Sequence, residues 1–148
     1  MKPVKGLRIR TMKDSDLAPI MEIDKKVVGK DRISSWPQAV SSHFRTYYPS
    51  LSFVAETDDR VIGFIIGIIL GAEYDLPLSG WVNIMGVDPE YQGRGVGRML
   101  LRSFIEGCHQ RGMKARVVVR QKDERLKKFL ASLGFQQGDV VDFVKGFD

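Results

Sequence analysis

Apolar and polar residues along the chain follow patterns of two kinds, one with the period of a strand and one with the period of a helix. Leu7-Arg8-Ile9-Arg10 alternates apolar and basic side chains, which predicts a half-buried strand. Apolar residues at helical spacing between Leu17 and Val27, followed by Gly29, predict a helix that ends at a glycine. The same reasoning predicts strands at residues 7–10, 51–56, 61–70, 81–87 and 115–120, helices at 17–27, 35–47, 96–110 and 123–133, and one or two closing strands in the tail 135–147.

The order of these elements, β-α-α-β-β-β-α-β-α-β, predicts a single mixed domain over residues 1–148. Thr57-Asp58-Asp59-Arg60 is typical of a hairpin turn between two strands. The segment 61–70 is nearly continuous in Val, Ile and Phe, which predicts a strand buried on both faces. We therefore expect an α/β (α+β) fold in which a mixed sheet of about six to seven strands is flanked by about four helices.

Cysteine content, apolar segments and net charge indicate where the protein is located and which class of partner it binds. The single cysteine, Cys108, excludes an intramolecular disulfide, and with only two histidines a structural zinc site is not expected. The N-terminal residues lack the apolar stretch of a signal peptide, and the longest apolar run, 61–72, is too short to span a bilayer. The net charge of +5 favours anionic partners, but the basic residues are spread along the chain. We expect a cytoplasmic protein that binds neither membranes nor nucleic acid.

The most informative segment is the glycine-rich turn between the predicted strand 81–87 and the helix that follows. A helix N-terminus exposes unpaired N–H groups and a partial positive charge. Glycines at 93, 95 and 97 let the backbone approach an anion closely, and Arg94 and Arg98 add forked donors. The turn is therefore predicted to bind a diphosphate, the alternative being a plain tight turn with arginines in solvent.

Two better-known phosphate motifs are excluded by the residues of this turn. A dinucleotide-binding fingerprint that starts at Gly93 requires glycine or another small residue where Arg98 stands. A P-loop requires a Gly-Lys-Ser/Thr ending, and none follows the turn.

The context of the turn resembles the central motif of the GCN5-related N-acetyltransferase (GNAT) family. That motif is Gln/Arg-x-x-Gly-x-Gly/Ala, and it is matched at Gln92, Gly95 and Gly97, with Val87-Asp88-Pro89 in register before it. The resemblance extends to Ile9–Leu17, Gly63-Phe64 and Leu133-Gly134-Phe135. It therefore implies the GNAT fold along nearly the whole chain.

The resemblance also implies a cofactor and its site. Acetyl-CoA would be the co-substrate, no metal would take part, and an amine would attack the thioester directly in a ternary complex. The pyrophosphate would lie on the turn and the pantetheine arm between the strands that contain Val87 and Val118. We expect the strand irregularity at Gly86, since a glycine there permits a bulge. The residues implied to bind the cofactor are Met85, Gly86, Val87, Gln92, Gly93, Arg94, Gly95, Val96, Gly97 and Arg98.

The sequence departs from the family pattern at the usual acid and base. Leu130 stands where many members place a tyrosine acid, and Val118 stands where the branch that acetylates ribosomal proteins places a glutamate base. Glu73, Asp75 and Asn83 are candidate replacements, although a solvated or hydrogen-bonded surface role is the more usual one for such residues.

The acceptor is expected to be a primary amine, on a small molecule or at a peptide or protein N-terminus. A site with no strong base suits an α-amine with a pKa of about 7.7–8.0 better than a lysine side chain near 10.4. Two alternatives remain open at this level, a CoA-binding regulatory domain without turnover and a basic nucleic-acid-binding module. The chain is compatible with a monomer or a homodimer.

Overall fold

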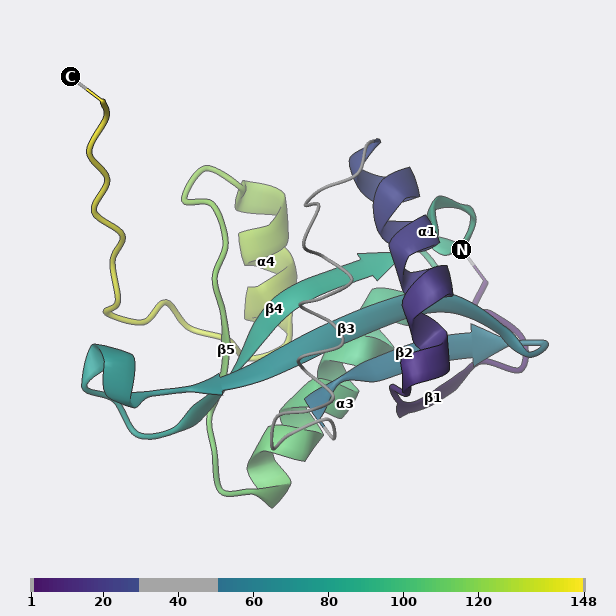
Figure 1. Cartoon of the computed structure of the whole chain (residues 1–148), viewed down its shortest axis with the longest axis horizontal. Helices are drawn as coiled ribbons and strands as arrows, with labels where there is room; N and C mark the ends of the chain where they lie inside the picture. The colour runs from purple at the N-terminus through teal and green to yellow at the C-terminus, as the bar shows by residue number, and fades with distance from the viewer. Residues whose placement is uncertain (1, 30–50, 148) are drawn as a thin grey trace. The chain divides into compact units, whose positions relative to one another are not determined.

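The computed structural model of the chain describes residues 2–29 and 51–147, and the chain divides into two compact units after Val117. The first unit holds a five-stranded sheet with the strands in the order β1-β2-β3-β4-β5 (Figure 1). Strands β1 to β4 run antiparallel to their neighbours, and β5 runs parallel to β4. The predicted mixed α/β class is confirmed, with somewhat fewer strands than expected.

The elements agree closely with the predicted positions in the first unit. Among the described residues the strands are β1 (Arg8–Thr11), β2 (Phe53–Thr57), β3 (Arg60–Leu70), β4 (Ser79–Val87) and β5 (Ala115–Val117). The α-helices are α1 (Leu17–Val28), α3 (Val96–Gln110) and α4 (Glu124–Ser132), and short 3-10 turns occur at η1 (Asp14–Asp16), η3 (Ala72–Tyr74) and η4 (Pro89–Tyr91). The predicted helix 35–47 lies outside the described residues.

The hairpin between β2 and β3 turns within the predicted segment 57–60, with two residues in its loop. Asp58 and Asp59 have φ angles of 49° and 59°, and the flanking residues Thr57 and Arg60 pair with each other. Positive φ at both central residues is the geometry of a type I′ turn, whose twist matches that of the strands. The prediction of a turn at residues 57–60 is confirmed.

Helix α1 lies across one face of the sheet (Figure 1). Ile20 and Ile23 pack with Phe64 and Ile66 of β3 in one buried cluster. Gly29, with a φ of 85°, ends the helix and donates its N–H to the Lys25 carbonyl. This is the left-handed glycine cap that the sequence predicts.

Helix α3 packs on the other face of the sheet, where glycines of β3 make room for it. A Cβ atom on Gly67 would lie 2.6 Å from the ring of Phe104, and one on Gly63 would lie 3.1 Å from Leu100. Leu100 and Phe104 are fully buried. The near-continuous apolar run of β3 is therefore buried on both faces, as predicted, because a helix covers each of them.

Two strand predictions in the last third of the chain are wrong. Strand β5 ends at Val117 rather than at Arg120. The tail 135–147 forms no strand among the described residues, and Phe143 and Val144 are 91% exposed. Apolar content alone cannot make a strand, because a strand also needs a hydrogen-bonding partner along its length. The second unit, described by itself, contains α4, which Asp123 caps by accepting the Leu126 N–H as predicted.

Candidate functional site

The turn between β4 and α3 is closed by side chains of its own residues. The Oδ1 atom of Asp88 accepts the N–H of Glu90 at 3.0 Å, and this contact caps η4. The side-chain amide of Gln92 donates to the Val87 carbonyl at 3.0 Å. Gln92, the first residue of the motif, therefore folds the turn back onto the end of β4.

The glycines of the turn have the backbone geometry that the sequence predicts. Gly93 and Gly95 have φ angles of 75° and 84°, which lie in the left-handed region that favours glycine. Gly95 precedes the first residue of α3, and a Cβ atom built on it would meet no heavy atom of the described residues within 4 Å. The surface at this helix N-terminus is therefore open. A Cβ atom on Gly97 would make ordinary contacts, 3.8 Å long, with Met85 and Val87.

The first turn of α3 has the properties of an anion site. The first intrahelical bond that reaches back into the turn runs from the Met99 N–H to the Gly95 carbonyl at 3.1 Å. The N–H groups of Val96 and Gly97 come before it and have no helical acceptor. Arg94 stands beside them, with its Nε atom 3.0 Å from the Lys2 carbonyl and its guanidinium 5.6 Å from the centre of the Tyr91 ring. Arg98 is half-buried in the same helical turn.

The last residues of β4 before this turn have no strand partner on the side away from β3 among the described residues. Parallel pairing with β5 covers only Gly80–Val82, and its last pair is Val82 with Val117. The Asp88 N–H donates to Ile62 on β3, so the backbone groups of Met85 and Val87 point away from β3 by the alternation of a strand. No strand of the described chain pairs with them there. The edge of β4 at Met85 and Val87 therefore has no strand partner among the described residues of the first unit. This is the edge of β4 on which the family resemblance places the pantetheine arm.

The strand irregularity of β4 is at Asn83, so the prediction that placed it at Gly86 is wrong. The register with β3 shifts between Ile66 and Gly67, which leaves Asn83 as the extra residue, and its side chain is exposed. Gly86 instead pairs regularly with Phe64. A Cβ atom on Gly86 would lie 3.0 Å from the Phe64 ring, so the glycine serves close packing. The backbone N–H and carbonyl of Gly86 face β3. Of the three β4 residues predicted to bind the cofactor, Met85 and Val87 are therefore the two whose backbone groups face away from β3.

Glu73 and Asp75, two of the candidate bases, lie before the start of β4. Glu73 accepts the Gly71 N–H at 2.9 Å, and this hydrogen bond lowers the pKa of its carboxyl group. Asp75 is exposed and has a φ of 56°. The glycine-rich turn follows the other end of β4, roughly 25 Å away at about 3.3 Å a residue. Of the three candidates, Asn83 alone lies within β4, directly after the last pair with β5.

The residues at the usual acid and base positions offer no titratable group. Leu130 is 8% exposed within the second unit, and Val118 is 74% exposed. Cys108 is fully buried on α3, and burial raises the pKa of its thiol to about 11. The predicted burial of Cys108 on the apolar face of its helix is confirmed.

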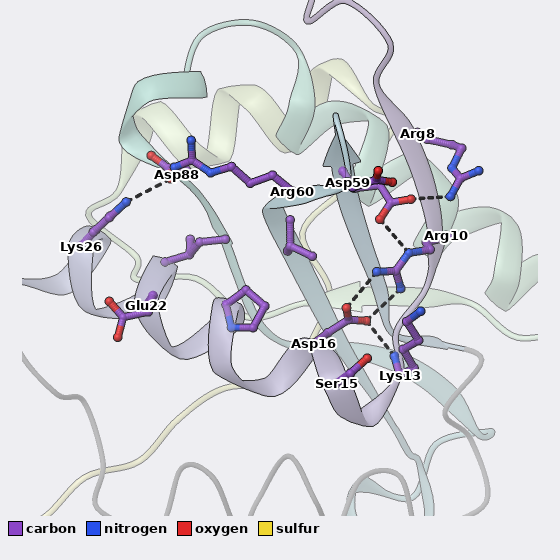
Figure 2. Close-up of a pocket in the computed structure, with 14 residues that line it drawn as sticks. Arg8, Arg10, Lys13, Ser15, Asp16, Glu22, Lys26, Asp59, Arg60 and Asp88 are labelled. Atoms are coloured by element: carbon purple, nitrogen blue, oxygen red, sulfur yellow. Dashed lines mark hydrogen bonds and ion pairs between the residues drawn. The ribbon is translucent and has the colours of Figure 1, made fainter.

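Asp88 has a position that the sequence patterns did not predict. The sequence pattern places it only at the end of a strand. In the structure its side chain is 2% exposed and lies 3.3 Å from both Lys26 and Arg60. It borders a cavity of about 740 Å³ that is also lined by Arg10, Asp16 and Glu56 (Figure 2). The local sequence indicates only that Asp88, which stands before Pro89, caps a helical turn. It does not indicate the contacts with Lys26 and Arg60.

Two further observations limit the kinds of site in the described residues. These residues contain no group of three or more His, Cys, Asp or Glu side chains placed to hold a metal ion. No helix in the described part of the chain has the length and apolar character needed to cross a membrane.

Comparisons with known proteins agree with this geometry. A family model described as an acetyltransferase (GNAT) domain matches residues 49–137. N-alpha-acetyltransferase 30 of Schizosaccharomyces pombe is 27% identical over 111 residues, which cover 74% of this chain and 73% of that protein. N-alpha-acetyltransferase RimI of Mycobacterium tuberculosis is 39% identical over 61 residues, which cover 41% of this chain and 37% of that protein.

A solved structure has a similar fold. The aminoglycoside enzyme AAC(6')-Iy, in complex with a bisubstrate analogue that contains CoA, superposes with a TM-score of 0.78 over 95% of this chain and 97% of its own. Its sequence is 18% identical, so the likeness concerns the fold.

Proposed function

Because the chain belongs to the acetyltransferase (GNAT) family and is an N-acetyltransferase, we propose that it transfers the acetyl group of acetyl-CoA to a primary amine in a ternary complex. The observation that carries this proposal is the edge of β4 at Met85 and Val87, where no strand of the first unit pairs with these residues because β5 ends opposite Val82. This unpaired edge of β4 continues through the turn to the N-terminus of α3. An extended thioester cofactor with a diphosphate has the shape and charge that such a site accepts.

Each part of the cofactor has a counterpart among the described residues. The pyrophosphate lies on the turn 93–98, where Gly95 leaves open surface and the first N–H groups of α3 lack helical acceptors. The pantetheine amides bond to the backbone of Met85 and to the Val87 N–H in the way that a neighbouring strand would, while the Val87 carbonyl accepts from Gln92. Arg94 and Arg98 supply positive charge beside the pyrophosphate.

The reaction needs little from side chains. The amine nitrogen attacks the thioester carbonyl carbon, a C–N bond forms, the C–S bond breaks, and CoA leaves as a thiolate that takes up a proton. An ordinary thiol has a pKa of about 8.5, so the thiolate is a competent leaving group near neutral pH without a tyrosine acid. The amine must arrive neutral or lose its proton to water, since Leu130 and Val118 cannot accept it.

The absence of a titratable side chain at Val118, the usual position of the base, favours an α-amine as the acceptor. At pH 7 an α-amine is neutral roughly a tenth of the time, whereas a lysine side chain is neutral in only about one molecule per few thousand. Both curated relatives described above are named N-alpha-acetyltransferases, which supports the same choice. We therefore propose peptide or protein N-termini, or small molecules with a similarly weak amine, as substrates. The single, buried cysteine is compatible with a reduced, cytoplasmic location.

The test is a comparison of two peptides in an assay of CoA thiol release at pH 7. One peptide has a free α-amine and no lysine, and the other has the same sequence with a blocked N-terminus and one lysine. The proposal predicts faster turnover of the first peptide, and faster turnover of the second would contradict the choice of acceptor. Binding of acetyl-CoA without turnover of either peptide or of any small amine would instead support a regulatory domain.

A further inference from the structure

The carboxylate of Asp88 joins three elements at one buried point. Its Oδ2 atom lies 3.3 Å from Lys26 Nζ on α1 and 3.3 Å from Arg60 Nη2 at the start of β3. Its Oδ1 atom accepts the N–H of Glu90 in η4, and its own N–H donates to Ile62. The side chain is 2% exposed, so both ion pairs are shielded from solvent on the carboxylate side. Figure 2 shows Lys26 and Arg60 converging on Asp88 across the rim of the cavity.

Arg60 makes a second contact with the turn before α3, a cation–π contact with Tyr91. Its guanidinium lies 5.8 Å from the centre of the Tyr91 ring, and the guanidinium of Arg94 lies 5.6 Å from it. Tyr91 is the last residue of η4, and the motif begins at the next residue, Gln92. The position of the turn before α3 is therefore determined from α1 and β3 as well as from β4.

We propose that Asp88, with Lys26 and Arg60, is a positioning group that sets the cofactor turn in its binding geometry. This inference rests on the proposed function. Asp88 does not touch the cofactor in this account. It orders η4, and η4 places Gly93, Gly95 and the first N–H groups of α3 where they bind the pyrophosphate. Preorganised donors bind an anion more tightly than donors that must first be ordered.

Whether Asp88→Asn weakens or strengthens acetyl-CoA binding distinguishes a positioning role from a simple effect of charge. Acetyl-CoA is an anion, so removal of a nearby carboxylate strengthens its binding through long-range charge interactions. The positioning account predicts the opposite, because Asp88→Asn retains an acceptor for Glu90 but loses both ion pairs. Weaker binding after loss of a negative charge is therefore the informative result.

Asp16 provides a matched control for this substitution. It borders the same cavity, its side chain is 4% exposed, and it pairs with Arg10 and accepts the Lys13 N–H. In the described part of the chain, none of its hydrogen bonds or ion pairs reaches the turn before α3. We expect Asp88→Asn to raise the dissociation constant for CoA about tenfold, the size of effect typical of a lost coupling between neighbouring groups. We expect Asp16→Asn, which also removes one buried negative charge, to change it by less than about twofold.

A second pair of variants tests the inference if Asp88→Asn does not fold. Lys25 and Lys26 are adjacent, exposed lysines of α1, and Lys26 is the one that contacts Asp88. Lys26→Met and Lys25→Met remove the same charge from the same helix. The positioning account predicts that only Lys26→Met weakens CoA binding, and equal effects of the two variants would overturn it.

The outcome also separates this inference from the proposed function. If the wild-type protein does not bind CoA, the proposed function fails. If it binds CoA and the folded Asp88→Asn variant binds it as tightly or more tightly, the proposed function stands and the positioning role is wrong. Circular dichroism melting of every variant shows which of them are folded at the temperature of the titration.

Discussion

The Sγ atom of Cys108 on α3 occupies the space that a side chain at Gly80 on β4 would need, since a Cβ atom built there would lie 2.3 Å from it. Both residues are buried. Gly80→Ala should therefore overpack this interface and reduce the free energy of unfolding by about 2 kcal/mol in urea titrations. Gly97→Ala is the control, because its Cβ atom would be 3.8 Å from its neighbours in a helix, where alanine is favoured. Equal stability of the two variants would contradict the packing described here.

Cys108 should not react with thiol reagents while the protein is folded. Burial raises the pKa of this thiol to about 11, so the reactive thiolate is scarce at pH 8, and the side chain is fully buried. Modification by an aromatic disulfide reagent at pH 8 should proceed only as fast as the protein opens, and should become fast in denaturing urea. Rapid, stoichiometric labelling of the native protein would show that the α3 interface is open.

Stability in acid should depend on the contact between Asp16 and Arg10. Burial alone would raise the pKa of Asp16, but the hydrogen bonds from Arg10 and from the Lys13 N–H outweigh it, so the pKa lies below its ordinary value. A carboxyl group of this kind stabilises the folded state above its pKa in the unfolded chain, and this contribution disappears as pH falls through its lower pKa in the folded protein.

The corresponding variant is Asp16→Asn. It should lose about 3 kcal/mol of unfolding free energy at pH 7, the usual cost of removing one partner of a buried ion pair. The difference from wild type should narrow below about pH 4. Urea unfolding at several pH values measures it, and a difference that does not change with pH would rule out a role for the Asp16 charge.

Glu73 should contribute to the local fold rather than to the reaction. Its carboxylate accepts the Gly71 N–H, and the lowered pKa makes it a weaker base than an ordinary glutamate. We expect Glu73→Gln to retain kcat within about twofold, because no proton transfer depends on the carboxylate. A loss of about tenfold or more in steady-state assays, with an unchanged melting temperature, would restore Glu73 as a catalytic candidate.

Local signals were sufficient to predict the elements nearest the site. Helix α3 begins at Val96 and ends at Gln110, as predicted, because glycines mark both of its ends. The hairpin at Asp58-Asp59 and the end of α1 at Gly29 were predicted for the same reason. These features depend on the conformational preferences of a few adjacent residues, and such preferences can be read from the sequence.

Features that depend on distant residues were not predictable in this way. Gly86 allowed either a bulge or a close approach, and the choice depends on Phe64, which lies opposite it on β3. The buried position of Asp88 depends on Lys26 and Arg60, which are 62 and 28 residues away in the chain. The length of β5 likewise depends on where β4 stops pairing with it, not on the valines at 117–119.

A calorimetric titration with acetyl-CoA measures whether the turn before α3 binds the pyrophosphate of this cofactor. Three proteins should be compared, the wild type, Gly95→Glu and Gly112→Glu. Gly95 and Gly112 lie near opposite ends of α3, and both have positive φ. A Cβ atom on either would have no neighbour within 4 Å in the part of the chain that the structure describes. The two substitutions therefore impose similar strain and the same charge change. The account predicts micromolar binding by the wild type and by Gly112→Glu, and none by Gly95→Glu. Binding that is unaffected by Gly95→Glu, or absent from the wild type, would contradict it.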